Sequence, residues 1–235
     1  MGVPADPRRA RRARHHGGAV DRVADPQGRR DRPGAPAGRP GWAEFLRSQA
    51  QGILALGFFT ADLLNGTKAH VLAVIEHGSR CIRILGATEN PVQSWVVQQA
   101  RNLLMDLEDA GAQAKFVLHD RDAIFTQAFD AVFQAAGIRV IRSAVQAPRM
   151  NSIMERWIGS CRRELLNRTL VWNLRHLMMV LREYENFYNS HRPHRALDQA
   201  APLRPLPGGV TDLDHFQVRR HDRAGGVIHE YRLVA

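Results

Sequence analysis

Three acidic residues of this chain have the types and surroundings that metal-dependent phosphoryl-transfer chemistry requires. Asp62 ends the run Gly-Phe-Phe-Thr-Ala-Asp, Asp120 ends Phe-Val-Leu-His-Asp, and Glu155 lies inside Asn-Ser-Ile-Met-Glu-Arg-Trp. Carboxylate oxygens are the ligands that hard divalent cations prefer. Two strand-end aspartates and one helical glutamate can hold a pair of such cations, which activate the attacking oxygen and stabilise the leaving oxygen at phosphorus.

Each of these residues also has a simpler interpretation. A strand aspartate can instead satisfy the backbone of a turn, and a glutamate on an amphipathic helix usually belongs to the solvated face. Asp122 could replace Asp120 as a ligand, although its position favours capping of the turn. The three acidic positions are therefore informative only as a joint pattern.

The elements that would position the carboxylates follow from the hydrophobic pattern. Extended runs are expected at residues 53–64, 69–75, 81–85, 115–118 and 138–141. Helical periodicity is found at residues 92–110, 124–136, 151–167 and 174–190. This order predicts an α/β fold with one mixed five-stranded sheet flanked by helices. If the first and fourth strands are neighbours, Asp62 and Asp120 point into one crevice.

The charge balance predicts a polyanionic partner. The 235 residues include 33 Lys and Arg against 23 Asp and Glu, a net charge of +10, and only Lys68 and Lys115 are lysines. Nucleic acid is the expected partner, and an anionic membrane surface is a less common one. Arginine drift in a GC-rich genome is the alternative explanation. Cys81 and Cys161 form neither a disulfide framework nor a zinc set, and no apolar run reaches membrane-span length, so a cytoplasmic protein without a membrane partner is expected.

The helix that carries Glu155 predicts a surface for binding DNA. Asn151, Glu155 and Arg162 lie on one edge of that helix, because seven positions make about two turns. Metal ligation would fall to Glu155 and phosphate contact to Arg162. The expected DNA-binding residues are Asn151, Arg156, Arg162, Arg163, Arg192 and His194. His191 and His194 lack further zinc ligands nearby, so the Arg-Pro-His segment is expected to pack the exit from the last helix.

Composition divides the chain into four segments. Residues 1–41 are rich in Arg, Pro and Gly and cannot form a core, so they are expected to be disordered. This segment is either a nonspecific DNA-binding arm or a misplaced start or out-of-frame translation. Residues 42–51 are an expected entry helix, 52–205 the core, and 206–235 a tail or small β-hairpin.

The joint pattern resembles the integrase-core (DDE) transposases of bacterial insertion sequences and, more remotely, the catalytic domains of retroviral integrases. The family's first aspartate maps to Asp62, and its second, five residues before a phenylalanine, maps to Asp120. Glu155 matches the third carboxylate, 35 positions later, and Arg162 matches a basic residue seven positions beyond it. Residues 188–197, Tyr-Asn-Ser-His-Arg-Pro-His-Arg-Ala-Leu, resemble the signature that closes this core.

The resemblance implies an RNase H-like fold and a DDE polynucleotidyl transferase. Such an enzyme performs metal-dependent DNA cleavage and strand transfer in DNA integration and recombination. Asp62, Asp120 and Glu155 would hold two Mg²⁺ ions, for which Mn²⁺ can substitute, and no small-molecule cofactor is implied. The implied partners are transposon ends, target DNA and further copies of the chain. The alternatives are a catalytically decayed remnant that binds DNA nonspecifically, or an RNase H-like nuclease.

Two departures from the family pattern affect the site. The second motif reads His-Asp-Arg-Asp at residues 119–122, where many family members have Asp-Asn-Gly. Met150 and Met154 flank the glutamate, which is unusual for a polar active-site edge, although flexible apolar side chains could pack beneath it.

Overall fold

A computed structural model describes residues 41–144, 148–205 and 217–234 of the chain. Most of the segment 1–41 and part of the segment 206–235 therefore lie outside the described residues. The entry segment forms the short helix α1 (Trp42–Ser48), followed by a 3-10 turn at Ala50–Gly52. None of the helices in the described ranges has the length and apolar character needed to cross a membrane.

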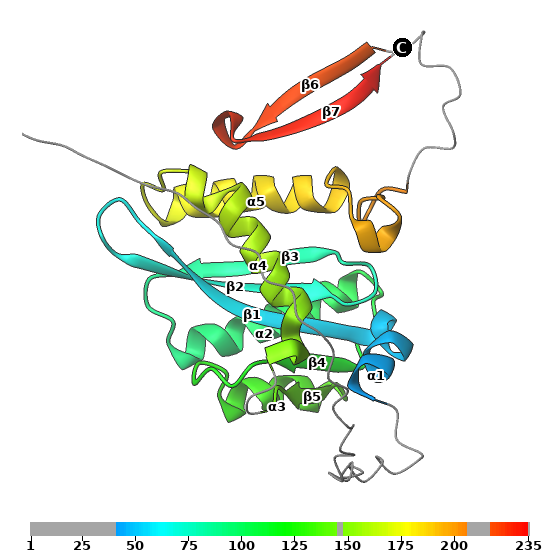
Figure 1. Cartoon of the computed structure of the whole chain (residues 1–235). Helices are drawn as coiled ribbons and strands as arrows, with labels where there is room; N and C mark the ends of the chain where they lie inside the picture. The colour runs from blue at the N-terminus through cyan, green and yellow to red at the C-terminus, as the bar shows by residue number, and fades with distance from the viewer. Residues whose placement is uncertain (1–40, 145–147, 206–216, 235) are drawn as a thin grey trace, which may run out of the picture. The chain divides into compact units, whose positions relative to one another are not determined.

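The core is built on one mixed sheet of five strands in the order β3-β2-β1-β4-β5 (Figure 1). Strands β1 (Ile53–Asp62), β2 (Lys68–Glu76) and β3 (Ile82–Thr88) form an antiparallel meander. Strand β4 (Phe116–His119) runs parallel to β1, and β5 (Arg139–Arg142) runs parallel to β4. The five-stranded mixed sheet expected from the sequence is confirmed.

Helices cover both faces of this sheet. Helices α2 (Gln93–Asp109) and α3 (Gln127–Ala135) pack against the face that carries Leu54 and Leu56. Helices α4 (Ser152–Glu164) and α5 (Leu174–Ser190) pack against the other face, which carries Ala55 and Phe59. Because strand side chains alternate between faces, the odd-numbered residues of β1 point toward α4 and α5.

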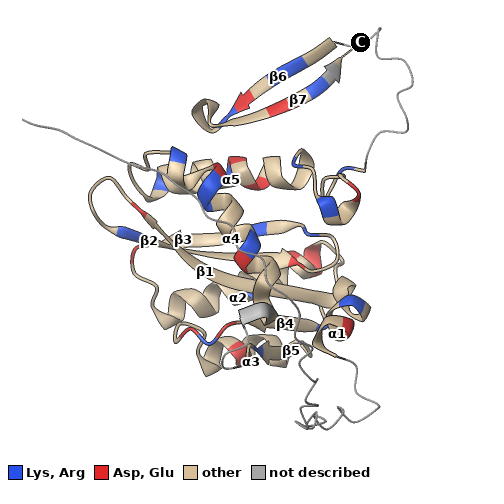
Figure 2. Ribbon diagram, in the orientation of Figure 1, with Lys and Arg blue, Asp and Glu red and all other residues tan. Residues whose placement is uncertain are grey.

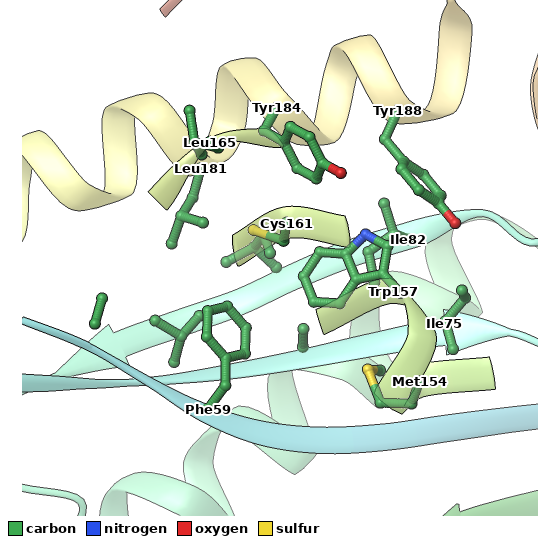
Figure 3. Close-up of a cluster of buried hydrophobic side chains, with 14 of the residues drawn as sticks. Phe59, Ile75, Ile82, Met154, Trp157, Cys161, Leu165, Leu181, Tyr184 and Tyr188 are labelled. Carbon is green, nitrogen blue, oxygen red and sulfur yellow. The ribbon is translucent and has the colours of Figure 1, made fainter. Parts of the chain in front are cut away.

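The α4 face of the core is centred on Trp157 (Figure 3). The indole of Trp157 is 1% exposed, and its ring centroid lies 5.7 Å from that of Phe59 and 6.4 Å from that of Tyr188. Met154 and Cys161 lie one turn to either side of Trp157 and are fully buried. Spacing of three and four residues therefore sets the buried stripe of α4.

The loop between β4 and α3 is held by short-range hydrogen bonds. Asp120 Oδ1 accepts from the backbone N–H of Asp122 at 3.1 Å, and Asp122 Oδ1 accepts from that of Ile124 at 3.1 Å. Thr126 Oγ1 accepts from the backbone N–H of Phe129 and caps α3, which starts later than the hydrophobic pattern predicts. Asp122 thus caps the turn, which was the favoured interpretation of this residue.

The last described segment is an antiparallel hairpin of β6 (Gln217–Arg223) and β7 (Ile228–Val234). Its turn contains Gly225 and Gly226 at φ 66° and 88°, conformations that glycine adopts without strain. Glu230 is buried and accepts from Arg223 Nε at 2.5 Å, and it lies 3.3 Å from His191 Nε2.

Candidate functional site

Asp120 follows β4 directly and lies beside β1. The parallel register pairs Ile53 with Phe116 and Ala55 with Leu118. Continuing this register by two residues places Gly57 of β1 beside Asp120. The residue of β1 that faces the predicted second carboxylate is therefore a glycine.

Asp62 lies at the far end of β1, five residues beyond Gly57. At about 3.3 Å per residue, this offset separates Asp62 from the level of Asp120 by about 16 Å along the strand. The offset is odd, so Asp62 and Gly57 also point toward opposite faces of the sheet. The first and fourth strands are neighbours, as expected. Asp62 and Asp120 nevertheless do not point into one crevice, because β4 pairs with the N-terminal part of β1 and Asp62 lies at its C-terminal end.

Asp62 instead lines a pocket of about 370 Å³ with Thr60, Arg162 and Asn167. The guanidinium of Arg162 lies 6.0 Å from the centroid of the Phe59 ring. Neither Asp120 nor Glu155 lines this pocket. Asp62 and Arg162 therefore border one pocket at the end of β1, near the C-terminal part of α4 and away from its first turn.

The first turn of α4 lies over Gly57. A Cβ atom built on Gly57 would meet Met154 Cγ at 2.5 Å and Ile158 Cδ1 at 3.2 Å. Glu155, the next residue after Met154, is exposed. Asp120 therefore lies beside Gly57 on the neighbouring strand, and Glu155 lies in the helix turn that covers Gly57.

Asn151 fixes the start of α4 to the sheet. Its side chain is 5% exposed, and its Nδ2 donates to the Leu56 carbonyl oxygen at 2.9 Å. Its Oδ1 is buried without a hydrogen-bond partner among the described residues. Asn151 was predicted as a DNA contact, and the structure shows an anchor between helix and strand.

The residues present do not fit a two-ion Mg²⁺ site. No three His, Cys, Asp or Glu side chains within the described ranges form a group that could hold a metal ion. Asp120 lies beside Gly57 and Glu155 lies in the helix turn above it, whereas Asp62 lies five residues farther along β1 and so is displaced from both. Three carboxylates would be needed to balance two hard cations in the arrangement that the resemblance implies.

A buried ion network that the sequence did not reveal holds the end of β4. His119 Nε2 lies 2.9 Å from Asp130 Oδ1, and Arg142 Nε donates to Asp130 Oδ2 at 2.8 Å. The His119 and Asp130 side chains are almost fully buried. The network joins β4, α3 and β5 directly next to Asp120. Its members come from separate elements, so no local motif identifies it.

A second pocket, of about 400 Å³, lies between α4 and the segment that follows α5. It is lined by Arg80, Ile153, Arg156, Trp157, Ser160, Tyr188, Arg192, His194, Arg195 and Ala196. No acidic side chain lines it. Trp157 Nε1 is buried and has no hydrogen-bond partner among the described residues. The pocket thus combines guanidinium groups with an unused donor.

Arg80 reaches this pocket from the turn between β2 and β3. Its backbone φ is 65°, a left-handed conformation that is strained for a residue with a side chain. Burial lowers the pKa of Arg80, and the nearby Arg156 lowers it further, whereas Tyr188 opposes the shift. Arg80 and Arg156 therefore repel each other in the absence of an anion.

Arg192 is held by a carboxylate inside the protein. Arg192 Nη2 donates to Glu164 Oε1 at 2.7 Å and Arg192 Nε to Glu164 Oε2 at 2.9 Å, while Tyr184 Oη donates to Glu164 Oε2 at 2.9 Å. Burial alone would raise the pKa of Glu164, but the hydrogen bonds from Arg192 and Tyr184 lower it overall. The guanidinium also lies 5.4 Å from the Tyr188 ring centroid. Arg192 was predicted to contact DNA; in the structure it joins the segment after α5 to α4 and also lines the arginine-rich pocket.

His194 and Arg163 have different surroundings. The His194 side chain is buried, with its ring centroid 4.6 Å from that of Tyr188, and burial lowers its pKa. It therefore packs the exit from α5, as the sequence favoured. Arg163 is exposed and its guanidinium donates weakly to Ser160 Oγ at 3.4 Å. Figure 2 shows positively charged positions along α4 and after α5.

Comparison with known proteins agrees with the architecture. Residues 136–202, which include α4, α5 and Glu155, match the family model described as Integrase core domain. No curated protein matches the chain. The fold is similar to a chain of the simian T-cell lymphotropic virus intasome in complex with PP2A regulatory subunit B56 gamma, with a TM-score of 0.53 and 13% identity over 79% of this chain and 67% of that one.

Two further solved structures have lower scores. The HTLV-2 integrase catalytic core domain in complex with magnesium, in its trimeric form, has a TM-score of 0.48 and 11% identity over 64% of this chain and 93% of that one. The catalytic core domain of BIV integrase has a TM-score of 0.45 and 13% identity over 65% and 91% of the two chains. The expected RNase H-like fold and the relationship to integrase cores are confirmed.

Proposed function

We propose that this chain is the core domain of a DNA transposase or integrase, and that its own part in DNA integration and recombination is to bind DNA. The integrase core match over residues 136–202 supports the class of protein. The observation that carries DNA binding is the arginine-lined pocket beside α4, where guanidinium groups converge without an acidic partner in its lining.

The chemistry of this pocket favours a phosphate. Arg80, Arg156 and Arg195 line it, and a planar guanidinium donates two parallel hydrogen bonds to phosphate oxygens. The buried indole N–H of Trp157 is a further donor, and a bound anion would relieve its missing hydrogen bond. The net charge of +10 adds a long-range attraction to a polyanion. A DNA backbone presents such phosphates in series.

Metal-dependent cleavage and strand transfer need a complete carboxylate set. Asp120 and Glu155 flank one point of the sheet, and Asp62 is displaced from it along β1, so the residues do not fit two Mg²⁺ or Mn²⁺ ions. The same set would be needed by an RNase H-like nuclease. We therefore propose a DNA-binding core of transposase type, in preference to a strand-transfer enzyme or a nuclease.

The partners follow from the same proposal. The similar solved chain belongs to an intasome, and one HTLV-2 integrase core structure is described as a trimer. By this similarity we propose that the chain acts as a multimer of its own copies on DNA, with transposon ends and target DNA as the substrates of the assembly. We also propose, from the resemblance of the sequence motifs alone, that the chain is related to the transposases of bacterial insertion sequences.

Equilibrium binding of a labelled branched DNA, measured by fluorescence anisotropy at several salt concentrations, tests the proposal. Arg80→Ala, Arg156→Ala and Arg195→Ala should each weaken binding several-fold, and each lost phosphate contact should lower the salt slope by about 0.9. Arg101→Ala is the matched control, because Arg101 is an exposed arginine on α2, which covers the opposite face. An equal loss of DNA affinity in all four variants, or no loss in any of them, would show that this pocket does not contact DNA.

A further inference from the structure

We infer that Gly57 occupies the β1 position from which an integrase-type core would supply its first carboxylate, and that Met154 fills the space this carboxylate would need. The inference rests on the proposed function only in taking the chain to be such a core. It concerns the chemistry that the chain has lost, whereas the proposed function concerns the DNA that it binds.

The strand register carries the first step. Phe116 and Leu118 of β4 belong to the same core layer as Ala55 and Phe59 of β1. Because strand residues alternate between faces, Gly57, which lies between Ala55 and Phe59, and Asp120, which lies two residues after Leu118, point toward α4 as well. A side chain at position 57 would therefore project between the two strands toward the helix that carries Glu155.

Packing around Gly57 carries the second step. Met154 is fully buried, and its Cγ and Sδ would lie 2.5 Å and 3.2 Å from a Cβ at position 57. Figure 3 shows Met154 directed from α4 onto β1. A glycine inside a strand loses packing and conformational freedom, and it is typical of sites where another group approaches the backbone closely. Here the approaching group is the apolar side chain of Met154.

The two residues therefore depend on each other. An aspartate at position 57 would meet Met154 at sub-contact distance and would be buried against a thioether without a hydrogen-bond partner, which is unfavourable. Alanine at position 154 would remove the two contacts with Met154 and leave only Ile158 Cδ1, at 3.2 Å from the Cβ of this aspartate. Restoring the carboxylate set should then require both Gly57→Asp and Met154→Ala, and either substitution alone should fail.

Isothermal titration of the full chain with Mn²⁺ tests this inference without an activity assay. We expect wild type, Gly57→Asp and Met154→Ala to bind Mn²⁺ weakly, and the double variant Gly57→Asp/Met154→Ala to bind at least tenfold more tightly. Asp120→Asn added to the double variant should abolish the gain, whereas Asp62→Asn added to it should not. A double variant that folds by circular dichroism and gains no affinity would overturn the inference.

The wild-type arm keeps the test decisive if the double variant fails to fold. Asp62→Asn at an exposed position should leave the Mn²⁺ titration of the natural chain unchanged. Tight Mn²⁺ binding by wild type that Asp62→Asn removes would show that Asp62 completes the site, and would overturn the assignment of Gly57. DNA binding by the same wild-type sample is measured in parallel. Absence of DNA binding would refute the proposed function, whereas the assignment of Gly57 is judged from the Mn²⁺ titrations alone.

Discussion

Met154 of α4 lies against the backbone of Gly57 in β1, so close that a Cβ on residue 57 would come within 2.5 Å of Met154 Cγ. This contact holds the first turn of α4, which carries Glu155, against the part of the sheet where Asp120 lies beside Gly57. An apolar side chain thus stands where the three-carboxylate pattern requires polar ligands. The contact links the packing of the core to the chemistry that the chain can perform.

Removing the Met154 side chain should destabilise the fold. Met154→Ala creates a cavity in a fully buried position, and such substitutions cost about 2–5 kcal/mol of unfolding free energy. Met179→Ala is the control, since Met179 is 53% exposed on α5 and should change stability by less than about 0.5 kcal/mol. Urea denaturation monitored by tryptophan fluorescence gives both values. A Met154→Ala loss as small as that of the control would mean that Met154 does not fill the space above Gly57.

The hydrogen bonds between Arg192 and Glu164 should contribute more than an exposed pair. Arg192→Ala leaves the half-buried Glu164 carboxylate without its main partner and should cost about 1–3 kcal/mol. Arg182→Ala, which removes an exposed partner of Glu185 on the same helix, should cost less than about 1 kcal/mol. Chemical denaturation of the two variants at pH 7 makes this comparison.

The contribution of Glu164 should also depend on pH with a defined sign. Its pKa is lower in the folded protein than its ordinary value because Arg192 and Tyr184 donate to the carboxylate. The stabilisation is therefore fully present above the unfolded-state pKa of about 4.3 and is lost as the pH falls through the lower folded pKa. The stability difference between wild type and Arg192→Ala should shrink below about pH 4. A difference that stays constant down to pH 3 would contradict this account.

His77 should make stability fall in mildly acidic solution. Burial, with a smaller effect of Arg80, lowers the pKa of His77 to about 4. Between its ordinary pKa of about 6.5 and this value the unfolded chain binds a proton that the folded chain excludes, so unfolding becomes easier as the pH falls. His77→Gln should remove this part of the pH dependence in denaturation curves between pH 7 and 4.5, whereas His221→Gln at an exposed site should keep it.

Arg162 remains a predicted phosphate contact, and its position also allows a second role, packing on Phe59, that the same variant can distinguish. It stacks near Phe59 and lines the same pocket as Asp62. If it contacts DNA, Arg162→Ala should weaken binding and lower the salt slope by about 0.9. A lower unfolding free energy with an unchanged salt slope would instead assign Arg162 to packing on Phe59.

The sequence predicted most of the architecture because the relevant signals are local. The apolar runs, the Asn65-Gly66 turn and the 3.6-residue periodicity of the helices each lie within one element. The place of Asp120 at the end of a strand and the capping role of Asp122 could be predicted in the same way, since both follow from a strand end and its turn. The expected order of strands and helices therefore matches the structure.

The residue of β1 that faces Asp120 could not be predicted in this way. The run from Ile53 to Ala61 is apolar on both faces, so it contains no alternation that shows which residues point toward α4. Asp62 is the only acidic residue of β1, so residue type alone points to it, while the pairing of β1 with β4 is set by contacts more than 50 residues apart. Asn151 and Arg192 likewise have partners in distant elements, Leu56 and Glu164, which their charge or polarity does not reveal.

The most direct test of the account is an assay of branch resolution with Mn²⁺, using a branched DNA that mimics the joined product. Wild type and Glu155→Gln are compared for DNA binding and for resolution in the same samples. The account predicts that both bind the DNA and that neither resolves the branch, because position 57 carries no carboxylate. Resolution by wild type and not by Glu155→Gln would contradict it and would show a working three-carboxylate site.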